Sequence, residues 1–383
     1  MELSIQPIKD RTDLKTFVEF PWQIYKEDPF WVPPLLDDRY SRLDVARNPY
    51  WQDAERVLWI ARLGSRPVGT IAAIIDHRRN QHTGNPIGIF GFFECIHDES
   101  VARGLLKCAG DWLLQHGLTR MIGPYNPSES DELGILVEGF NTRPAIMEAH
   151  TPVYYPSLFD AVGFVKYNDV LARLVTISPE CRNFNQIFPE KLLRIAERVS
   201  QRSDIHIRKV NMQDWQVEIK LACKLYNEAL CALPDYVPIS EDEFKVFANS
   251  FKEILSPDMA LIAEVGSRPV GFAIALPDVN EALQHLDGKL GPLELAKLWW
   301  FTRKIKRVSF KILIMVPEYQ GRGIEALLIL RVAQAIWNKG YREVDMSLTG
   351  EENLKSSLLQ EHIGFAVYRR YRIYQKNLAW PQT

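Results

Sequence analysis

The stretch Val316-Pro317-Glu318-Tyr319-Gln320-Gly321-Arg322-Gly323-Ile324 joins a predicted strand to a predicted helix. The apolar, β-branched run at 310–315 is typical of a strand, and apolar residues recur with helical spacing over 326–339. A helix N-terminus presents unpaired N–H groups and a partial positive charge. The glycines let phosphates approach those groups, and Arg322 adds a full charge. The residues therefore predict a phosphate-binding turn.

Length and composition narrow the class of protein. A chain of 383 residues favours two domains, and 46% hydrophobic with 25% charged residues is typical of a soluble globular protein. A formal net charge of -2 argues against a nucleic-acid binder. No apolar run reaches about 18 residues, so we expect no stable membrane insertion. Without a signal peptide, a Cys-x-x-Cys pair or metal-ligand histidine spacing, we expect a cytoplasmic protein with no metal.

An internal repeat sets the architecture. The segment Gly64-Ser65-Arg66-Pro67-Val68-Gly69 recurs 202 residues later, at 266–271. The opening strands at 3–8 and 205–210 keep this offset, and Gly163-Phe164 returns as Gly364-Phe365, 201 residues later. Three pairs of matching segments, separated by 201 or 202 residues, predict that the two halves arose by duplication. Each half alternates strands and helices around a hairpin, which indicates an α+β fold with a mixed sheet flanked by helices.

The duplication suggests domain boundaries. We place the first unit at residues 1–175 and the second at 203–383. Residues 176–202 would connect them, with an amphipathic helix that starts after Pro189.

The second half resembles the GNAT superfamily of acyl-CoA N-acyltransferases. The resemblance rests on Gln320-Gly321-Arg322-Gly323-Ile324-Glu325 after Val316-Pro317, and on Asn353 followed by Gly364-Phe365 and a strand. Through the repeat it extends, more weakly, to the first half. It implies two tandem GNAT-like domains, each with a central mixed sheet flanked by helices.

The resemblance also implies acetyl-CoA or another acyl-CoA as cosubstrate in the second half. The residues expected to bind it are Ile314, Met315, Val316, Gln320, Gly321, Arg322, Gly323, Ile324 and Asn353. In the first half, the strand at 91–96 runs into the helix at 101–115 without a glycine turn, and Asp98 and Glu99 would oppose a phosphate. The first half is therefore predicted to bind no CoA.

Two residues depart from the family pattern. Glu325 takes the place of a small residue: its carboxylate would repel a pyrophosphate if it pointed inward, or would favour the helix dipole if it pointed away. Gln360 takes the place of a tyrosine that protonates the departing thiolate in many members. Ordinary acetyl transfer would therefore lack its usual proton donor at 360, and an inward-pointing Glu325 would also weaken its binding of CoA.

Candidate catalytic and acceptor residues follow from the same comparison. Asp345 is the predicted general base, on a strand where Ser347 and Thr349 would share its face; the alternative is a structural, hydrogen-bonded aspartate. The predicted substrate-binding residues lie where the family's helix-loop-helix covers the acceptor, and the alternative is an ordinary loop packed on the core. They are Tyr226, Glu228, Asp235 and Tyr236.

Two further segments carry open interpretations. The long polar loop at 123–132 either faces the cleft between the halves or is purely structural. The aromatic run Leu298-Trp299-Trp300-Phe301, followed by basic residues at 303–307, is typical either of a membrane-surface helix or of a helix packed on the sheet with an exposed basic edge. We favour the packed helix.

The resulting functional expectation is an acyl-CoA-dependent N-acyltransferase. Its acceptor would be a small-molecule amine or a peptide amine near the inter-domain cleft, with no nucleic-acid partner, and an oligomer is left open. The alternative is a non-catalytic GNAT-like scaffold that binds a metabolite or a protein partner. Tandem GNAT transferases that use aminoacyl-tRNA are a third class, but they need a basic track that this sequence lacks.

Overall fold

The repeated Gly-Ser-Arg-Pro segments form the same tight turn in both halves of the computed structural model, which describes residues 2–128, 130–233 and 236–379. Gly64 and Gly266 both have a φ of 62°, a left-handed conformation that glycine adopts without strain. The turns join β2 (Ala54–Leu63) to β3 (Arg66–Asp76), and β11 (Ala260–Val265) to β12 (Arg268–Pro277). Both hairpins also have a bulge at the same repeat position, after Ala61 and after Ala263. The halves thus share backbone detail as well as sequence.

The remaining elements follow the order expected from the sequence. The first half contains β1 (Leu3–Pro7), α1 (Arg11–Glu19), α2 (Pro21–Ile24), α3 (Leu36–Leu43), α4 (His77–Thr83), β4 (Gly88–Cys95), α5 (Glu99–Gln115), β5 (Arg120–Gly123), β6 (Tyr125–Asn126), β7 (Glu132–Leu133), β8 (Ile135–Glu138), α6 (Tyr155–Ala161) and β9 (Val165–Thr176). The connecting helix is α7 (Glu190–Ser200). The second half contains β10 (Ile205–Lys209), α8 (Trp215–Leu230), α9 (Glu241–Phe251), α10 (Asn280–Leu283), α11 (Pro292–Thr302), β13 (Arg307–Met315), α12 (Ile324–Asn338), β14 (Glu343–Gly350), α13 (Leu354–His362) and β15 (Ala366–Asn377).

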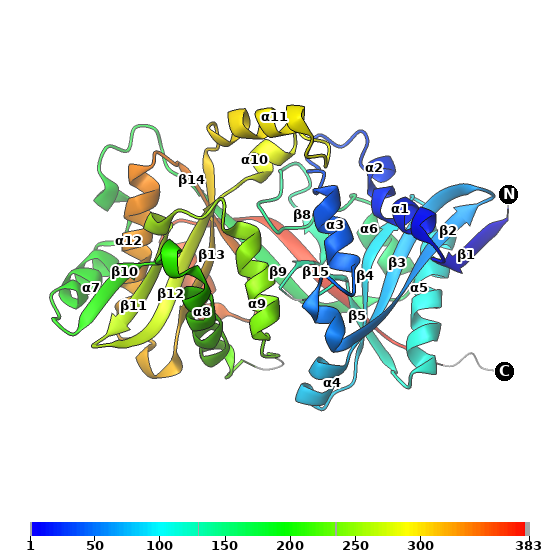
Figure 1. Cartoon of the computed structure of the whole chain (residues 1–383), viewed down its shortest axis with the longest axis horizontal. Coiled ribbons are helices and arrows are strands. Elements are labelled where there is room, and N and C mark those ends of the chain that lie inside the picture. The colour runs from blue at the N-terminus through cyan, green and yellow to red at the C-terminus, as the bar shows by residue number, and fades with distance from the viewer. Residues whose placement is uncertain (1, 129, 234–235, 380–383) are drawn as a thin grey trace.

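One continuous mixed sheet runs through both halves, in the order β1-β2-β3-β4-β5-β15-β9-β14-β13-β12-β11-β10. The last strand of each half crosses to the other: β15 pairs with β5 of the first half, and β9 pairs with β14 of the second. These two strands also pair with each other, from Ala366 opposite Leu174 to Gln375 opposite Val165. Figure 1 shows β9 and β15 crossing the middle of the molecule. Each half therefore completes its sheet with a strand of the other.

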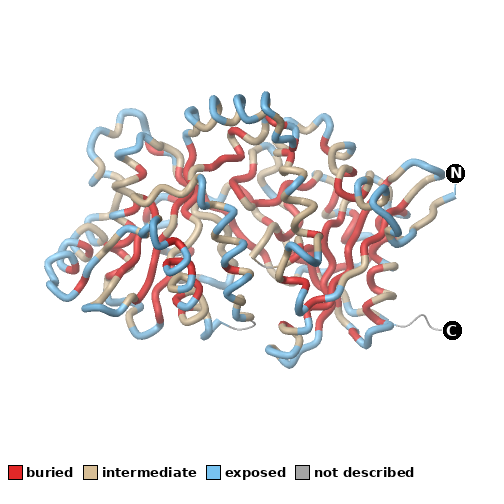
Figure 2. The backbone as a smooth tube through the Cα atoms, viewed as in Figure 1, coloured by how far each residue is buried: buried red, intermediate tan, exposed pale blue. Residues whose placement is uncertain are grey.

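Helices cover both faces of this sheet, and the buried residues concentrate on its strands (Figure 2). In the first half, α5 buries Val101, Leu105 and Leu113, which recur at helical spacing on its inner face. In the second half, α8 and α9 cover one face and α12 the other (Figure 1). Burial of each such large apolar side chain contributes roughly 1.5–3 kcal/mol.

Helix α11 corrects one expectation from the sequence. The favoured interpretation was a helix packed on the sheet, but no residue of α11 is buried, and Trp299 and Trp300 are 60% and 54% exposed. The helix lies at the edge of the molecule above α10 (Figure 1). Its apolar residues point in all directions, so the sequence pattern did not reveal which face, if any, the protein covers. No helix among the described residues combines the length and apolar character needed to cross a bilayer.

Candidate functional site

The turn after β13 has the geometry of an anion site. Gly321 and Gly323 have φ values of 72° and 84°, which allow the chain to turn sharply into the first residues of α12. Gln320 ties the loop to the strand, since its Nε2 donates to the Met315 carbonyl at 2.9 Å. Arg322 stacks on Tyr319, with its guanidinium carbon 4.8 Å from the ring centroid. The predicted turn thus forms, with Arg322 beside it.

The Glu325 side chain points toward this turn. Its Oε1 accepts a hydrogen bond from the Gly321 N–H at 2.8 Å. Of the two orientations considered from the sequence, the structure shows the one in which the carboxylate faces the loop. An N–H group that already holds a carboxylate can hold a phosphate oxygen, so the turn fits an anionic ligand, but Glu325 competes for the same donor.

On the strand side of the turn, β13 and β14 separate as β13 runs toward the turn. They pair only from Arg307 opposite Glu343 to Ser309 opposite Asp345. A cavity of about 210 Å³ lies where they part, lined mostly by apolar residues of β13, β14 and α12. Phe184 and Phe188 of the connecting segment also line it, as does the buried Gln360. This gap between splayed strands is an apolar slot for an extended ligand. Asn353 precedes α13 at the far end of β14.

Asp345 lies at the closed end of the gap. It is fully buried, and it accepts hydrogen bonds from the Ser309 hydroxyl, from the Ser347 N–H at 3.0 Å and from the Tyr368 hydroxyl at 3.1 Å. The expected alternation with Ser347 and Thr349 is wrong: Ser347 has a φ of 50°, and the pairing with β9 shifts there. This bulge breaks the two-residue repeat of the strand. The predicted role of Asp345 as a base stays a prediction.

A second buried carboxylate, Glu148, reaches the same place from the first half. The Tyr368 hydroxyl lies 3.1 Å from Glu148 Oε2, which also accepts from the Ala145 N–H at 3.1 Å. Its other oxygen, Oε1, has no hydrogen-bond partner among the described residues. Burial, followed by the charge of Asp345, raises the pKa of Glu148 to about 7. Glu148 is thus a carboxylate poised to titrate near neutral pH, with one free oxygen.

The second half holds the loop that carries Glu148. Asp278 Oδ1 accepts from the Ile146 N–H at 3.0 Å, and the Asn280 side chain donates to the Pro144 carbonyl at 3.1 Å. Burial raises the pKa of Asp278 to about 6, although nearby arginines oppose the rise. The position of Glu148 therefore depends on contacts between the two halves.

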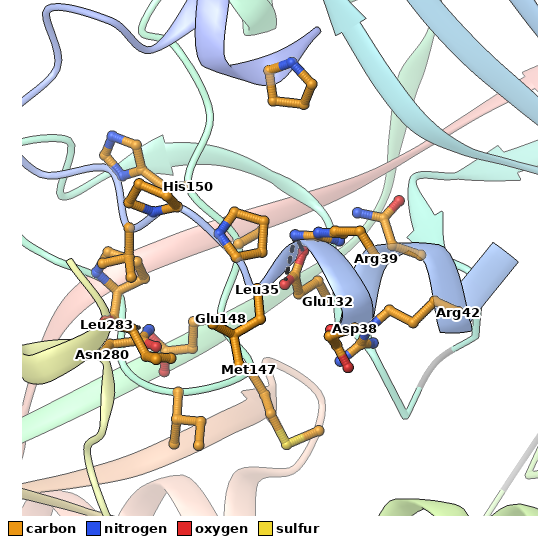
Figure 3. A pocket seen from close by; sticks show the side chains of 18 of the residues that line it. Leu35, Asp38, Arg39, Arg42, Glu132, Met147, Glu148, His150, Asn280 and Leu283 are labelled. Carbon is orange, nitrogen blue, oxygen red and sulfur yellow. Dashed lines mark hydrogen bonds and ion pairs between the residues drawn. The ribbon is translucent and has the colours of Figure 1, made fainter. Parts of the chain in front are cut away.

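A cavity of about 370 Å³ opens on the Glu148 side. Figure 3 shows Arg39 of α3 paired with Glu132 in one part of the wall, and Glu148 and Leu283 in another. Residues of both halves line it, and most of the lining is apolar. Glu94 also faces it, held by the hydroxyls of Tyr25 (3.0 Å) and Tyr155 (2.6 Å). Burial raises the pKa of Glu94 to about 7.

Lys311 is the cation that reaches the strand gap from this region. Its Nζ donates to the Ser347 hydroxyl at 3.2 Å, and its side chain lines the 210 Å³ cavity. Its charge lowers the pKa of both Glu148 and Asp278 against the effect of burial. The Glu148–Tyr368–Asp345 cluster and Lys311 therefore lie between the larger cavity and the strand gap.

The first half lacks a corresponding turn. Here α5 begins at Glu99, and the Asp98 carboxylate caps it by accepting from the N–H groups of Ser100 and Val101. The gap between β4 and β5 is filled by β6: Asn126 accepts from the Phe92 N–H at 2.6 Å, and a Cβ at Gly91 would lie 1.8 Å from the Tyr125 carbonyl oxygen. In the first half, the positions equivalent to the turn and to the strand gap of the second half are therefore both occupied by the chain itself.

The predicted acceptor residues lie elsewhere. Tyr226 and Tyr236 pack edge to face near Phe244, Tyr236 donates to Asn227 at 2.5 Å, and Glu228 pairs with Arg268. None of these three residues lines the two larger cavities, and Asp235 lies outside the described residues. Their role as an acceptor site stays a prediction. Sequence reasoning missed Glu148, because the segment from 139 to 150 has no periodicity or motif; the neighbouring polar loop was its nearest signal.

Known proteins share both this sequence and this architecture. The chain is 30% identical over 380 residues to protein YghO of Escherichia coli (strain K12), which covers 98% of this chain and 95% of that protein. It is also 30% identical over 387 residues to the bacterial ceramide synthase of Caulobacter vibrioides (strain NA1000 / CB15N), which covers 98% of each. No protein-family model matches the sequence.

Solved structures show the fold. A tandem GNAT protein from the clavulanic acid biosynthesis pathway aligns over 100% of both chains with a TM-score of 0.58 and 11% identity. A GCN5-related N-acetyltransferase from Anabaena variabilis ATCC 29413 aligns over 99% of this chain and 73% of its own, with a TM-score of 0.51 and 7% identity. The chain therefore has the tandem GNAT fold and belongs to the family that includes protein YghO and the bacterial ceramide synthase.

Proposed function

We propose that this protein is an acyl-CoA-dependent N-acyltransferase that acts on the amino group of a long-chain amine. The observation that carries the proposal is the position of Glu148. This carboxylate, with one free oxygen and a pKa of about 7, lines an apolar cavity and shares the Tyr368 hydroxyl with Asp345, which lies where the gap between β13 and β14 begins. A base with such a pKa can accept the proton of an attacking amine near neutral pH.

The second half fits the acyl-CoA. Its pyrophosphate would bind the N–H groups and Arg322 at the turn after β13, once Glu325 releases the Gly321 N–H. The pantetheine and the acyl group would follow the apolar gap toward Lys311. A thioester there is a reactive acyl donor. The Lys311 ammonium stabilises the negative charge that develops on the thioester oxygen as the amine attacks.

The larger cavity fits the acceptor. A volume of about 370 Å³ with a mostly apolar lining suits an alkyl chain, and Glu148 in its wall would receive the amine end. The name of the Caulobacter relative supports this choice, because a ceramide is the fatty-acyl amide of a long-chain amino alcohol. In the transfer, the C–N bond forms, the C–S bond breaks, the amine proton passes to Glu148, and CoA leaves as its thiolate, which takes a proton from solvent.

The direct test is turnover with defined substrates. The purified protein is incubated with sphinganine and acetyl-CoA, or with longer acyl-CoAs, and both the released thiol and the amide product are measured. We expect amide formation with the long-chain amine and little with a short amine such as ethanolamine. No amide from any pairing, although acyl-CoA binds in calorimetry, would overturn the proposal.

A second candidate, the non-catalytic scaffold, has its own support. Glu325 occupies the donor that a phosphate needs, and Gln360, whose amide N–H is not acidic enough to protonate a departing thiolate, lines the gap. A scaffold would bind a metabolite in the 370 Å³ cavity without turnover. Turnover separates the two candidates, since CoA that binds in calorimetry without amide formation from any amine of a panel favours the scaffold.

A further inference from the structure

Helix α11 carries apolar residues around its whole circumference. Successive helix positions are about 100° apart, so Leu298 and Thr302 lie on one side, Leu293 and Trp300 lie on the opposite side, and Trp299 lies between the two. The first side lines the 370 Å³ cavity. Leu293, Trp299 and Trp300 form an outer face toward solvent, where they are exposed by 64%, 60% and 54%. An exposed apolar face of this kind marks an interaction surface.

Basic residues surround this outer face. The Arg303 guanidinium carbon lies 3.2 Å from the Trp299 ring centroid, and Lys304 Nζ lies 4.7 Å from that of Trp300. Residues 287–306 contain five Lys or Arg residues against two acidic ones, in a chain whose net charge is -2. Tryptophan beside lysine and arginine is the combination that prefers the interface between water and an anionic bilayer.

The position of α11 links that face to the cavity. Leu298 and Thr302 form part of the cavity wall, and Phe301 stacks on His285, with centroids 3.9 Å apart. The segment before the helix contacts the first half, since Trp22 donates to Asp287 at 2.8 Å. The helix therefore forms the outer wall of the cavity at a place where both halves meet.

We propose that the outer face of α11 docks on the surface of an anionic lipid bilayer. The tryptophans would lie at the headgroup level and the basic residues would contact anionic headgroups. The cavity behind α11 would then face the layer from which a long-chain amine is taken; this last step rests on the proposed function, whereas the docking does not. A second copy of the chain fits the face less well, because a two-fold contact would bring the basic clusters together.

Vesicle co-sedimentation tests the docking without any substrate. The full chain is mixed with vesicles of phosphatidylcholine alone or with added phosphatidylglycerol. The variants are Trp299→Ser/Trp300→Ser, Arg303→Glu/Lys304→Glu and, as the matched control, Val217→Ser, which changes an exposed apolar residue of α8. Circular dichroism and thermal melting check that each variant folds, and sedimentation without vesicles reports the oligomeric state.

We expect the wild type and Val217→Ser to bind vesicles that contain phosphatidylglycerol, and to bind less at high salt. The tryptophan variant should lose about tenfold or more in partition coefficient, and the charge-reversal variant should lose the preference for phosphatidylglycerol. Wild-type protein that stays in solution with all vesicles overturns the docking, as does a folded tryptophan variant that binds like the wild type. A wild-type dimer that the tryptophan changes dissociate, without vesicle binding, would assign the face to a second copy. Vesicle binding without amide formation would leave the docking in place and overturn only the proposed function.

Discussion

The carboxylates of Glu148 and Asp345 come from different halves of the chain and meet at one hydroxyl group. The Tyr368 oxygen lies 3.1 Å from each of them. A hydroxyl donates a single proton, so only one carboxylate is satisfied by it at a time. Asp345 has two further donors, the Ser309 hydroxyl and the Ser347 N–H, and Glu148 Oε2 also has two, the Ala145 N–H and the Tyr371 hydroxyl. The carboxylates differ in Glu148 Oε1, which has no hydrogen-bond partner among the described residues. Glu148, with a free oxygen, is the member of the pair that is available to a substrate.

Replacement of Glu148 by glutamine should abolish the base while the size of the side chain is kept. We expect kcat to fall by about 100-fold or more, with little change in the affinity for acyl-CoA. The steady-state rate with a long-chain amine measures the first quantity and calorimetry the second. Asp345→Asn is the comparison: if it lowers kcat more than Glu148→Gln does, the base is Asp345, as the sequence suggested.

The pH dependence of the rate should report the same group. Glu148 acts as a base only when it is deprotonated, and burial with the charge of Asp345 raises its pKa to about 7. The rate should therefore be constant above that pH and fall about tenfold per pH unit below it. Rates measured from pH 5 to 9 test this. A profile without an acidic limb near neutrality, or a limb that persists in Glu148→Gln, would contradict the assignment.

Glu94 gives a prediction about stability. It faces the cavity rather than open solvent, and burial raises its pKa to about 7, so the folded protein binds more protons than the unfolded chain between about pH 4.5 and 7. The free energy of unfolding therefore falls as the pH rises through this window. Glu94→Gln removes the charge and should stabilise the protein by roughly 1–2 kcal/mol at pH 8, with a smaller effect at pH 5. Denaturant titrations at both pH values measure the difference. An equal effect at the two pH values would show that the carboxylate does not titrate in this way.

Glu325 should weaken CoA binding. Its carboxylate holds the Gly321 N–H and adds a negative charge beside the expected pyrophosphate. Glu325→Gln should therefore lower the Kd for CoA by about five- to tenfold. The control, Glu318→Gln, removes a charge from the same turn, but that side chain is 61% exposed and paired with Arg268, so about twofold or less is expected. The Kd of each variant for CoA is measured by calorimetry. If Glu318→Gln lowers the Kd more than Glu325→Gln does, Glu325 does not have this role.

Gly321 and Gly323 form a matched pair with which to test how closely the turn packs against α7. Both have positive φ, so alanine costs roughly 1–2 kcal/mol at either position. At Gly321 a Cβ would meet nothing within 4 Å, whereas at Gly323 it would lie 2.7 Å from Ile195 of α7. Gly323→Ala should therefore lower the melting temperature more than Gly321→Ala does. Adding Ile195→Ala should recover part of that difference; equal melting temperatures would mean that α7 does not press on the turn.

The hairpin turns and the strand-turn-helix unit could be predicted from the sequence because residues close together in the chain determine them. The repeated hexapeptide forms the hairpin turn in both halves, and the motif at 316–324 forms the turn between a strand, β13, and a helix, α12, as predicted. In contrast, Gly163-Phe164 and Gly364-Phe365 each precede a strand of 12 residues, and nothing in either strand specifies its partner. The exchange of β9 and β15 therefore could not be predicted from the pattern of either half.

The candidate site was predictable only where a motif exists. The turn is encoded by its glycines, but Glu148 becomes significant through contacts with Tyr368 and Tyr371, more than 200 residues away. Likewise, the pattern of α11 is the same whether Trp299 and Trp300 face a core or a lipid. Both cases depend on tertiary surroundings, which periodicity does not report.

The exchange of β9 and β15 makes the two repeats inseparable over evolutionary time. A truncation that removed the first repeat would take away the strand that pairs with β14 and, with it, the carboxylate of Glu148. The first repeat is therefore free to lose its own ligand turn but not to disappear. The backbone of the first copy is thus a structural part of the second, whatever ligand the first copy itself can hold.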